Sequence, residues 1–294
     1  MPELVKRGMI YRIEGPLYRI SEKTAKKYHD GIDYISDKKD YYRIFHKIVA
    51  ENLKVATVLP KTKSQLVKGA GEMNELSKKE LVKLMNLTMG YLPELRTLEK
   101  RSACPANILE YICYFMEASK NAKNPMDEFE DLMSKKFPEL HYDSQYESIM
   151  GAVDGENITL IIDSIFMNMA KRFMQMIRNL PAFYLLVKNR NAKDTDPKAD
   201  DWDLMTFGQF MEMADKSFNV PIEQRYKGLG ESDASMIFPS MMNPKTRKMV
   251  RITMEDAEEA RKTIELLHGD SEAMREARRK LLYDANITLE DIDN

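Results

Sequence analysis

The sequence predicts an α/β protein in which a long, mainly helical segment interrupts a sheet-forming domain. Three observations lead to this fold class. Residues 1–20 are rich in β-forming side chains, residues 219–294 alternate between strand and helix patterns, and the stretch between them carries apolar residues at helical spacing. The β-α-β-α order near the C-terminus is typical of a parallel sheet. We therefore expect a first block in 1–39, a mainly helical α+β segment in 40–218, and a second block in 219–294.

Composition excludes several classes of protein. Hydrophobic residues make up 43% of the 294 residues and charged residues 31%, which supplies a core and excludes a disordered chain. Forty-five Lys and Arg against 47 Asp and Glu give a formal net charge of −2, so the chain is no uniformly basic nucleic-acid binder, although local basic patches are compatible with it. No apolar run approaches the roughly 18 residues of a membrane span. Residues 1–7 lack the apolar segment of a signal peptide.

The two cysteines indicate a reducing compartment. Cys104 and Cys113 lie nine residues apart, a spacing that matches no metal site, and two thiols form no disulfide framework. We expect both to be reduced and buried in a cytoplasmic protein.

The chain opens with two predicted strands. Residues 9–13 and 17–20 are rich in β-formers, and Glu14-Gly15-Pro16 separates them. No partner strand precedes them, so we expect the beginning of this sheet to lie outside the chain.

Helical signals dominate residues 21–218. Ser77 and Glu80 form a capping box ahead of apolar residues at helical spacing from Leu81 to Leu98. Pro105 suits the first turn of a second helix. Further helices are predicted around residues 129–133 and after Thr206-Phe207-Gly208-Gln209. Residues 158–176 read as a strand followed by a helix, and the Asp-rich stretch 188–203 as a solvated loop.

Strands return after residue 219. Residues 220–226 and 248–252 are predicted strands, 227–230 a glycine turn, and 232–242 a helix that ends at Asn243-Pro244. Thr253 caps a further helix, for which Gly269 is the expected left-handed end, and Ser271 caps the last helix.

The strongest local signal for chemistry is the segment 224–231, Gln-Arg-Tyr-Lys-Gly-Leu-Gly-Glu. A strand brings Arg225 and Lys227 to the same face, because side chains alternate along it. Gly228 and Gly230 allow positive φ and a close approach of backbone. A turn of exposed amides beside two cations suits an anion such as phosphate. A plain tight turn between strand and helix explains the same residues, so both interpretations stay open.

Local charge favours the phosphate interpretation. Residues 225–251 hold six cations and two anions, and residues 252–294 hold six cations and twelve anions. Basic surface is therefore expected around the turn and the next strand, which include Lys245 and Arg247, where it would attract a nucleic-acid backbone.

Other candidate sites are weaker. His29, His46, His141 and His268 are scattered and show no zinc spacing. The glycines of residues 68–72 read as a linker, because no strand is predicted before them. The Asp-x-Asp of residues 291–293 reads as a frayed end. No hydrolase, metalloprotease or nucleotide-binding motif is present.

The segment 224–231, followed by Met242–Arg247, Glu255–Ala257 and Leu267–Asp270, resembles the end of the B subunit of bacterial DNA gyrase and its type IIA topoisomerase relatives. Residues 1–8 and 16–19 resemble the stretch that follows this family's metal-binding aspartates. The resemblance implies the distal half of a Toprim domain, which is Rossmann-like with a parallel sheet. It also implies a large gyrase-type insertion between the two matching blocks.

The resemblance further implies an ATP-dependent enzyme that cuts and passes double-stranded DNA. Family members bind Mg²⁺ through a glutamate and aspartates that precede the region matching Met1, and they bind ATP further upstream. Magnesium and ATP are thus expected for the whole enzyme, with their ligands outside this chain, which we expect to be inactive alone. No catalytic or metal-binding residue is expected here. The expected DNA-contacting or supporting residues are Arg225, Lys227, Gly228, Gly230, Lys245 and Arg247.

The expected partners are DNA, an N-terminal topoisomerase piece and a tyrosine-bearing breakage-reunion subunit, in the cytoplasm of a bacterium or a phage-infected host. Two origins fit the resemblance, a split gene such as some large phages carry, or a truncated sequence, and the first is favoured. An alternative function stays open, namely a non-catalytic module that binds a gyrase subunit or DNA and modulates it. The sequence does not distinguish supercoiling from relaxation or decatenation.

Overall fold

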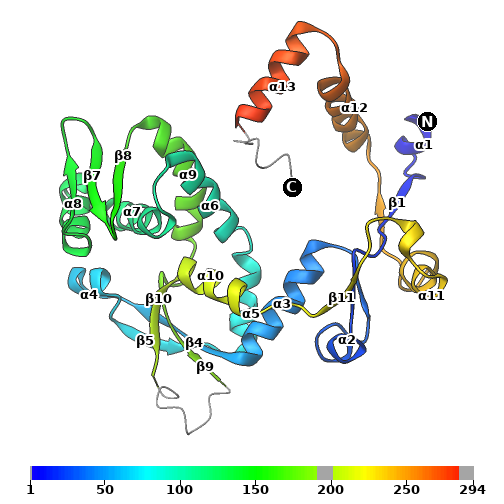
Figure 1. The fold of residues 1–294 in the computed structure, drawn as a ribbon, viewed down its shortest axis with the longest axis horizontal. Helices are drawn as coiled ribbons and strands as arrows, with labels where there is room; N and C mark the ends of the chain where they lie inside the picture. Colours follow the sequence, from blue (N-terminus) through cyan, green and yellow to red (C-terminus); the bar gives the residue numbers. More distant parts are fainter. Residues whose placement is uncertain (1, 191–200, 285–294) are drawn as a thin grey trace. The chain divides into compact units, whose positions relative to one another are not determined.

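A computed structural model describes residues 2–190 and 201–284 (Figure 1). The chain separates into two compact units. Unit 1 comprises Met1–Asp40 and Pro221–Asn294, and unit 2 comprises Tyr41–Val220. Both ends of the chain therefore contribute to unit 1. No helix of the described residues is long and apolar enough to cross a membrane.

Unit 1 is built from short elements drawn from both ends of the chain. Its first part contains α1 (Pro2–Lys6), β1 (Tyr11–Ile13), β2 (Tyr18–Ile20), α2 (Glu22–Tyr28), β3 (Tyr34–Ile35) and the start of α3 (Lys38–Asn52). Its second part contains β11 (Ile222–Arg225), η1 (Leu229–Glu231), α11 (Ala234–Ile237), η2 (Phe238–Met242), β12 (Met249–Arg251), α12 (Met254–His268) and α13 (Glu272–Asp284). These elements confirm the strands expected near residues 9–20, 220–226 and 248–252.

The parallel sheet expected from the β-α-β-α order is wrong for the described residues. β11 pairs antiparallel with β2, which pairs antiparallel with β3, and β12 pairs antiparallel with β1. The strands on either side of α11 thus lie in different sheets, because each takes a partner from the N-terminal block. A strand-helix-strand order produces a parallel pair only when both strands join the same sheet.

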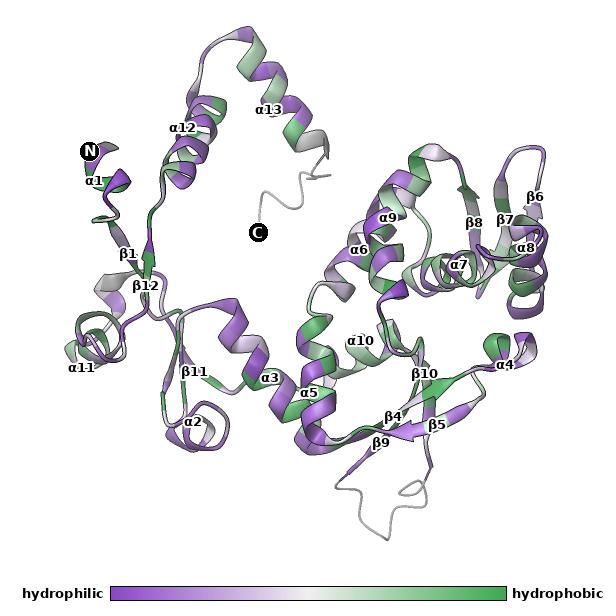
Figure 2. Ribbon diagram, turned by 180° about the vertical axis from the view of Figure 1, so that it is seen from behind, coloured by the Kyte–Doolittle hydropathy of each residue, from purple (hydrophilic) through white to green (hydrophobic). Residues whose placement is uncertain are grey.

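Unit 1 has a small apolar core among its described residues. Tyr34, Tyr226 and Met236 form a buried cluster. By contrast, every residue of β1 and β12 is exposed, including Tyr11, Met249 and Val250. Figure 2 shows the hydrophobic colouring along β12. A ribbon of paired strands with apolar residues exposed on it is marginal in water without further packing.

Unit 2 combines sheets and helices around a larger core. One antiparallel sheet has the order β10-β9-β4-β5, formed by β4 (Leu53–Leu59), β5 (Glu72–Glu75), β9 (Tyr184–Asn189) and β10 (Asp203–Thr206). Another has the order β6-β7-β8, formed by Leu140–Asp143, Ser148–Val153 and Glu156–Ile161. The helices are most of α3, then α4 (Lys63–Lys68), α5 (Lys78–Leu87), α6 (Tyr91–Ser102), α7 (Ala106–Ser119), α8 (Pro125–Lys136), α9 (Ser164–Arg178) and α10 (Phe207–Ser217). Helix α10 packs against β9 and β10, and Figure 1 shows α6, α7 and α9 on the same side of that sheet.

Helix starts follow the predicted caps. The capping boxes of Ser77 with Glu80 and of Thr206 with Gln209 are both present, and Thr253 forms a third with Asp256. Ser271 accepts the amide of Met274 at the start of α13. The predicted left-handed end at Gly269 is wrong, since its φ of −68° and ψ of 135° are extended. Cys104 and Cys113 are free and buried, as expected.

Several strands of unit 2 have no counterpart in the sequence prediction. β4 is buried along most of its length, so it lacks the alternation that distinguishes a strand from a buried helix. The hairpin of β7 and β8 turns at Asp154-Gly155, where both residues have positive φ. Asp-Gly is a strong hairpin signal, so this turn could have been predicted from the sequence. The expected loop 188–203 is shorter, because β9 extends to Asn189 and β10 begins at Asp203; residues 191–200 and 291–293 lie outside the described residues.

A buried carboxylate organises the middle of unit 2. Glu110 on α7 is 1% exposed and accepts hydrogen bonds from the Tyr91 hydroxyl at 2.8 Å, the Gly208 amide at 2.6 Å and the Thr206 hydroxyl. A Cβ at Gly208 would lie 2.8 Å from the Glu110 carboxylate oxygens, so glycine is required there. Glu110 thereby ties α6, α7 and the first turn of α10 together. Burial raises the pKa of Glu110 to about 6, although the three hydrogen bonds oppose that shift.

Glu110 should make the stability of unit 2 depend on pH. A carboxyl with a raised pKa stabilises the fold most when protonated, so its contribution is complete below about pH 4.5 and is lost as the pH rises through about 6. The shift corresponds to about 2 kcal/mol. Glu110→Gln keeps an acceptor and cannot ionise. Urea denaturation of parent and variant should therefore show their difference in unfolding free energy moving by about 2 kcal/mol between pH 4 and 7, in favour of the variant at pH 7. A constant difference would contradict this role.

Candidate nucleic-acid interface

The end of β11 presents two cations around a buried tyrosine. Arg225 pairs with Tyr18 of β2, and the Tyr226 amide donates to the Leu17 carbonyl at 2.9 Å. The Tyr226 side chain is 6% exposed and lies in the buried cluster with Tyr34 and Met236, whereas Arg225 and Lys227 are exposed. The hydrogen bond of Tyr226 to Leu17 thus holds its ring inside just after β11 ends, while the cations on either side of it stay exposed.

The turn after Lys227 differs from the expected one. The Lys227 amide donates to Glu231 Oε2 at 2.8 Å, and the Glu231 amide donates to the Gly228 carbonyl at 3.2 Å. Gly228 and Gly230 are absent from the described glycines with positive φ, and a Cβ on either would meet nothing within 4 Å. Neither glycine therefore adopts the positive φ that we expected it to allow. The physical reason is a tight 3-10 turn closed by the Glu231 carboxylate, which already occupies one of the amides expected to be exposed.

A second basic turn follows η2. Asn243 accepts the Lys245 amide on its side chain at 3.0 Å, and its carbonyl accepts the amides of Thr246 and Arg247 at 3.1 and 2.9 Å. The Thr246 hydroxyl also donates to the Pro239 carbonyl. Lys245 is exposed and Arg247 is half-buried. These contacts fix the backbone of the turn while its two cations keep their charged groups for other partners.

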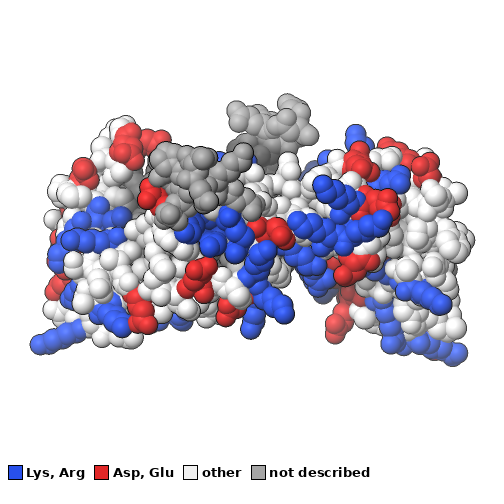
Figure 3. Space-filling view, turned by 90° about the horizontal axis from the view of Figure 1, so that it is seen from below, with Lys and Arg blue, Asp and Glu red and all other residues white. Residues whose placement is uncertain are grey.

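The cations expected at this interface keep their charge unpaired within the part of the chain that the structure describes. Arg225, Lys227, Lys245 and Arg247 form no ion pair with any residue in 2–190 or 201–284. Figure 3 shows Lys and Arg side chains, with Asp and Glu among them, gathered on unit 1 at the right of the view. Unpaired, exposed cations are the groups that bind phosphate most readily, because no internal ion pair has to break first.

Two other cations of the basic segment serve the fold. Lys248 contacts Asp37 at 3.4 Å and also pairs with Asp40, whose side chain is only 8% exposed. The guanidinium of Arg251 lies over Gly8, which has a φ of 69° and no room for a side chain unless Arg251 moves. Lys248 and Arg251 are also exposed, so they still contribute charge to the basic surface expected around this turn and strand.

The contact between Lys248 and the two aspartates shifts the pKa values of both Asp37 and Lys248. Burial raises the pKa of Asp37, but the amide of Asp40 and the charge of Lys248 outweigh it, and the net pKa lies below its ordinary value. Burial likewise opposes the charge on Lys248, yet the two aspartates raise its pKa overall. The contact therefore stabilises unit 1 between these two pKa values and weakens outside them at either end of the pH range.

The described residues do not form a magnesium site. No group of three or more His, Cys, Asp or Glu in 2–190 and 201–284 could hold a metal ion. Mg²⁺ needs several converging oxygen ligands, so these side chains do not fit the ion and we derive no metal-dependent step from them.

Known proteins match both the C-terminal block and most of the chain. Residues 218–282 match the family model of the carboxyl terminus of the DNA gyrase B subunit. The chain is 27% identical over 280 residues to the B subunit of the type 2 topoisomerase of Aquifex aeolicus, covering 92% of this chain and 32% of that protein. The chain resembles the carboxyl-terminal part of a type II topoisomerase B subunit.

Other relatives agree with this family resemblance. The DNA gyrase B subunit of Campylobacter jejuni is 28% identical over 280 residues, covering 92% of this chain and 31% of its own length. The B subunit of DNA topoisomerase 4 of Streptococcus pneumoniae is 30% identical over 157 residues, covering 51% of this chain and 23% of its own length. The chain thus spans about a third or less of these relatives.

Sequence reasoning missed two residues that shape the site. Tyr226 anchors the turn. Its position as an aromatic residue between the cations Arg225 and Lys227 could have predicted that its side chain is buried. Asp40 carries no such signal, because its contact with Lys248 joins residues that are far apart in the chain.

Lys248 and Lys245 allow a matched comparison of a lysine that forms an internal ion pair with one that does not. Lys248→Met should remove the cation that pairs with the buried Asp40 and loosen the β1–β12 ribbon, at a cost of about 1–2 kcal/mol, because Lys248 is partly exposed and the loss of a fully buried pair would cost about 3–5 kcal/mol. Lys245→Met should cost almost nothing, since Lys245 forms no ion pair with the described residues. Hydrogen exchange of the Glu14 and Ile252 amides, which bond the Lys248 and Ile10 carbonyls, reads the ribbon directly. Equal exchange in the two variants would contradict the assignment.

Proposed function

We propose that this chain is the carboxyl-terminal portion of the B-type subunit of an ATP-dependent type II DNA topoisomerase. In this proposal it forms the distal half of a Toprim domain, with residues 40–218 as an insertion. It supports magnesium-dependent cleavage of double-stranded DNA and strand passage, together with an N-terminal piece and a tyrosine-bearing breakage-reunion subunit. The similarity to B subunits along 92% of the chain is the observation that carries the proposal.

The DNA contact proposed for this chain rests on its unpaired cations. Arg225, the last residue of β11, and Lys227, two residues later, are both exposed, and the fixed turn after η2 exposes Lys245 beside Arg247. Because the Lys227 amide is already bonded to Glu231, we assign phosphate binding to the side chains and not to the backbone of the turn. Gly228 and Gly230 then serve to keep the turn small, which leaves room beside Lys227 for a phosphate or for the partner's metal site.

The need for a second polypeptide rests on how little unit 1 buries. Its ribbon of β1 and β12 is exposed throughout, and Tyr11, Met249 and Val250 on it are 44–48% exposed. The hydroxyl of Tyr226 is buried without a hydrogen-bond partner among the described residues. An unpaired buried hydroxyl costs about 1–3 kcal/mol. A partner that covers the ribbon and bonds this hydroxyl would relieve both costs.

Magnesium and ATP enter this proposal only through the partners. We assign the magnesium ligands and the nucleotide site to the N-terminal piece, and we propose that the isolated chain neither hydrolyses ATP nor cuts DNA.

The first test measures DNA binding by the isolated chain. Arg225→Ala/Lys227→Ala/Lys245→Ala should weaken binding to a duplex of random sequence. It should also reduce the slope of log K against log salt by up to about three, one for each phosphate that these side chains neutralise. Fluorescence anisotropy between about 50 and 200 mM salt measures that slope.

A charge-matched variant is the control for this test. Lys79, Lys100 and Lys123 are exposed lysines of unit 2, and replacing all three with Ala removes the same net charge. If this control lowers the salt slope as much as the first variant, the binding is non-specific attraction to the whole chain and the assigned interface is wrong.

The second test uses the reconstituted enzyme. Lys227→Ala should lower the rate of DNA cleavage or relaxation by roughly ten- to a hundredfold, corresponding to the loss of a charged hydrogen bond of about 1.5–3 kcal/mol. Thermal unfolding should be nearly unchanged, because the Lys227 side chain is exposed. Full activity with a lowered melting temperature would make Lys227 structural. Modulation of a gyrase by this chain, without any cleavage activity in a reconstituted complex, would instead support a non-catalytic interaction module.

A further inference from the structure

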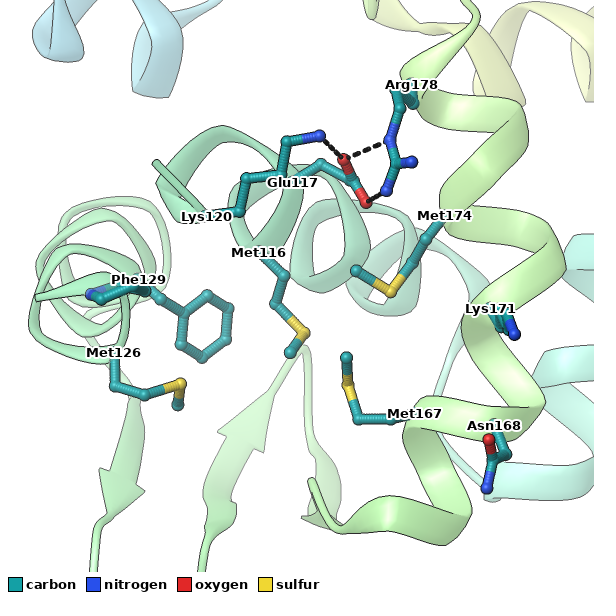
Figure 4. Close-up of a pocket in the computed structure, with 11 residues that line it drawn as sticks. Met116, Glu117, Lys120, Met126, Phe129, Met167, Asn168, Lys171, Met174 and Arg178 are labelled. Atoms are coloured by element: carbon teal, nitrogen blue, oxygen red, sulfur yellow. Dashed lines mark hydrogen bonds and ion pairs between the residues drawn. The ribbon is translucent and has the colours of Figure 1, made fainter. Parts of the chain in front are cut away.

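A groove on unit 2 lies between α8 and α9, with α7 as its floor (Figure 4). Its volume is about 530 Å³, which is within the range of ligand-binding pockets. The lining residues come from these three helices and are Met116, Glu117, Lys120, Pro125, Met126, Phe129, Met167, Asn168, Lys171, Met174 and Arg178. We call this feature the methionine groove.

The inside of the methionine groove is apolar and adaptable. Figure 4 shows Met116, Met167 and Met174 directed into the same space, opposite Phe129. Met167 is 37% exposed and Met126 is 38% exposed, although both line a concave surface. Methionine is flexible and polarizable, so a surface built from it can adjust to different apolar partners. The unburied apolar area indicates that this groove takes an apolar group.

The rim of the methionine groove is positively charged. Glu117 accepts hydrogen bonds from Arg178 at 2.9 and 2.7 Å and from Lys120 at 2.7 Å, and the bond from Arg178 is the main reason that its pKa lies below the ordinary value. Lys171 forms no ion pair with any described residue. The rim thus carries three cations and a single carboxylate, so an occupant with negative charge beside its apolar face is favoured.

The length of the groove fits a helix. Met167, Lys171, Met174 and Arg178 follow one another on α9 at intervals of four, three and four residues, so they lie along one face of that helix. At about 1.5 Å per residue this face is about 16 Å long, or about three helical turns. A helix laid beside α9 would place successive apolar anchors against Met174 and Met167 and its acidic flank against Arg178 and Lys171.

We propose that the methionine groove binds an acidic amphipathic helix of a partner protein. Its apolar side chains, spaced at i, i+4 and i+7, would fill the space between α8 and α9, and its Glu or Asp residues would pair with Lys171 and with the rim formed by Arg178 and Lys120. This interaction is separate from the DNA contact proposed for unit 1, and it does not depend on that contact. DNA itself is a poor occupant, because phosphates would gain nothing from the apolar floor.

The test uses a synthetic, fluorescein-labelled helical peptide of about three turns, with Leu anchors at i, i+4 and i+7 and Glu on both flanks. Its twin carries Lys in place of each Glu. With the full chain, anisotropy should show binding of the Glu peptide in the micromolar range and binding of the Lys peptide at least tenfold weaker. Raising the salt concentration should weaken the Glu peptide alone, because the attraction at the rim is electrostatic.

Three variants locate the contact. Lys171→Glu and Met167→Glu change partly or fully exposed side chains in the groove and should each weaken the Glu peptide at least tenfold, with circular dichroism unchanged. Lys171→Glu should also improve binding of the Lys peptide. Lys79→Glu makes the same change of charge on an exposed residue of α5 outside the groove and should leave both peptides unaffected.

Several results would overturn the proposal. These are equal affinity for the two peptides, an equal effect of Lys79→Glu and Lys171→Glu, or no binding of the Glu peptide up to about 1 mM, the weak limit of a specific contact. Binding of decanoate without binding of the Glu peptide would also overturn it and assign the groove to small anionic amphiphiles.

Discussion

Unit 1 depends on the antiparallel pairing of β11 with β2. The hydrogen bonds between these strands join the segment that precedes unit 2 in the sequence to the segment that follows it. They also set the register that turns Tyr226 inward, against Tyr34 and Met236, and turns Arg225 and Lys227 outward. A slip of one residue would reverse this arrangement and bury the cations. The basic surface proposed to bind DNA is therefore a consequence of strand register.

The two units differ in how much of their stability comes from their own residues. Unit 2 buries a dense set of aromatic rings, with Tyr91 packed against Phe173 and Phe207, and it satisfies the buried Glu110 through three donors. Unit 1 buries fewer large side chains, among them Ile20, Ile35 and Tyr226, and exposes a strand ribbon. The exposed apolar strands of unit 1 support the proposal that a second polypeptide covers them.

The cations of residues 225–251 fall into two groups, some with contacts inside the fold and some without, and the sequence does not distinguish them. Lys248 pairs with the buried Asp40, and the side chain of Arg251 lies against Gly8. Arg225, Lys227 and Lys245 have no such partner among the described residues and present their charge to solvent. Only the second group can meet a phosphate without a loss of internal pairing. The same distinction separates Lys171, at the rim of the methionine groove, from Lys120 and Arg178, which share Glu117.

The sequence by itself determined the local features of this protein. Capping boxes at Ser77, Thr206 and Thr253 are set by residues three apart, and so the helix starts could be predicted. The alternation around Tyr226 and the family resemblance of residues 224–231 are equally local. Tertiary structure alone decided which strands pair. β11 and β12 do not pair with each other, because each pairs with a strand of the N-terminal block. It also decided that β4, buried on both faces and without alternation, is a strand, and that Lys248 serves Asp40 while Lys245 keeps its charge unpaired among the described residues. Such contacts join residues distant in sequence, and neither spacing nor composition records them.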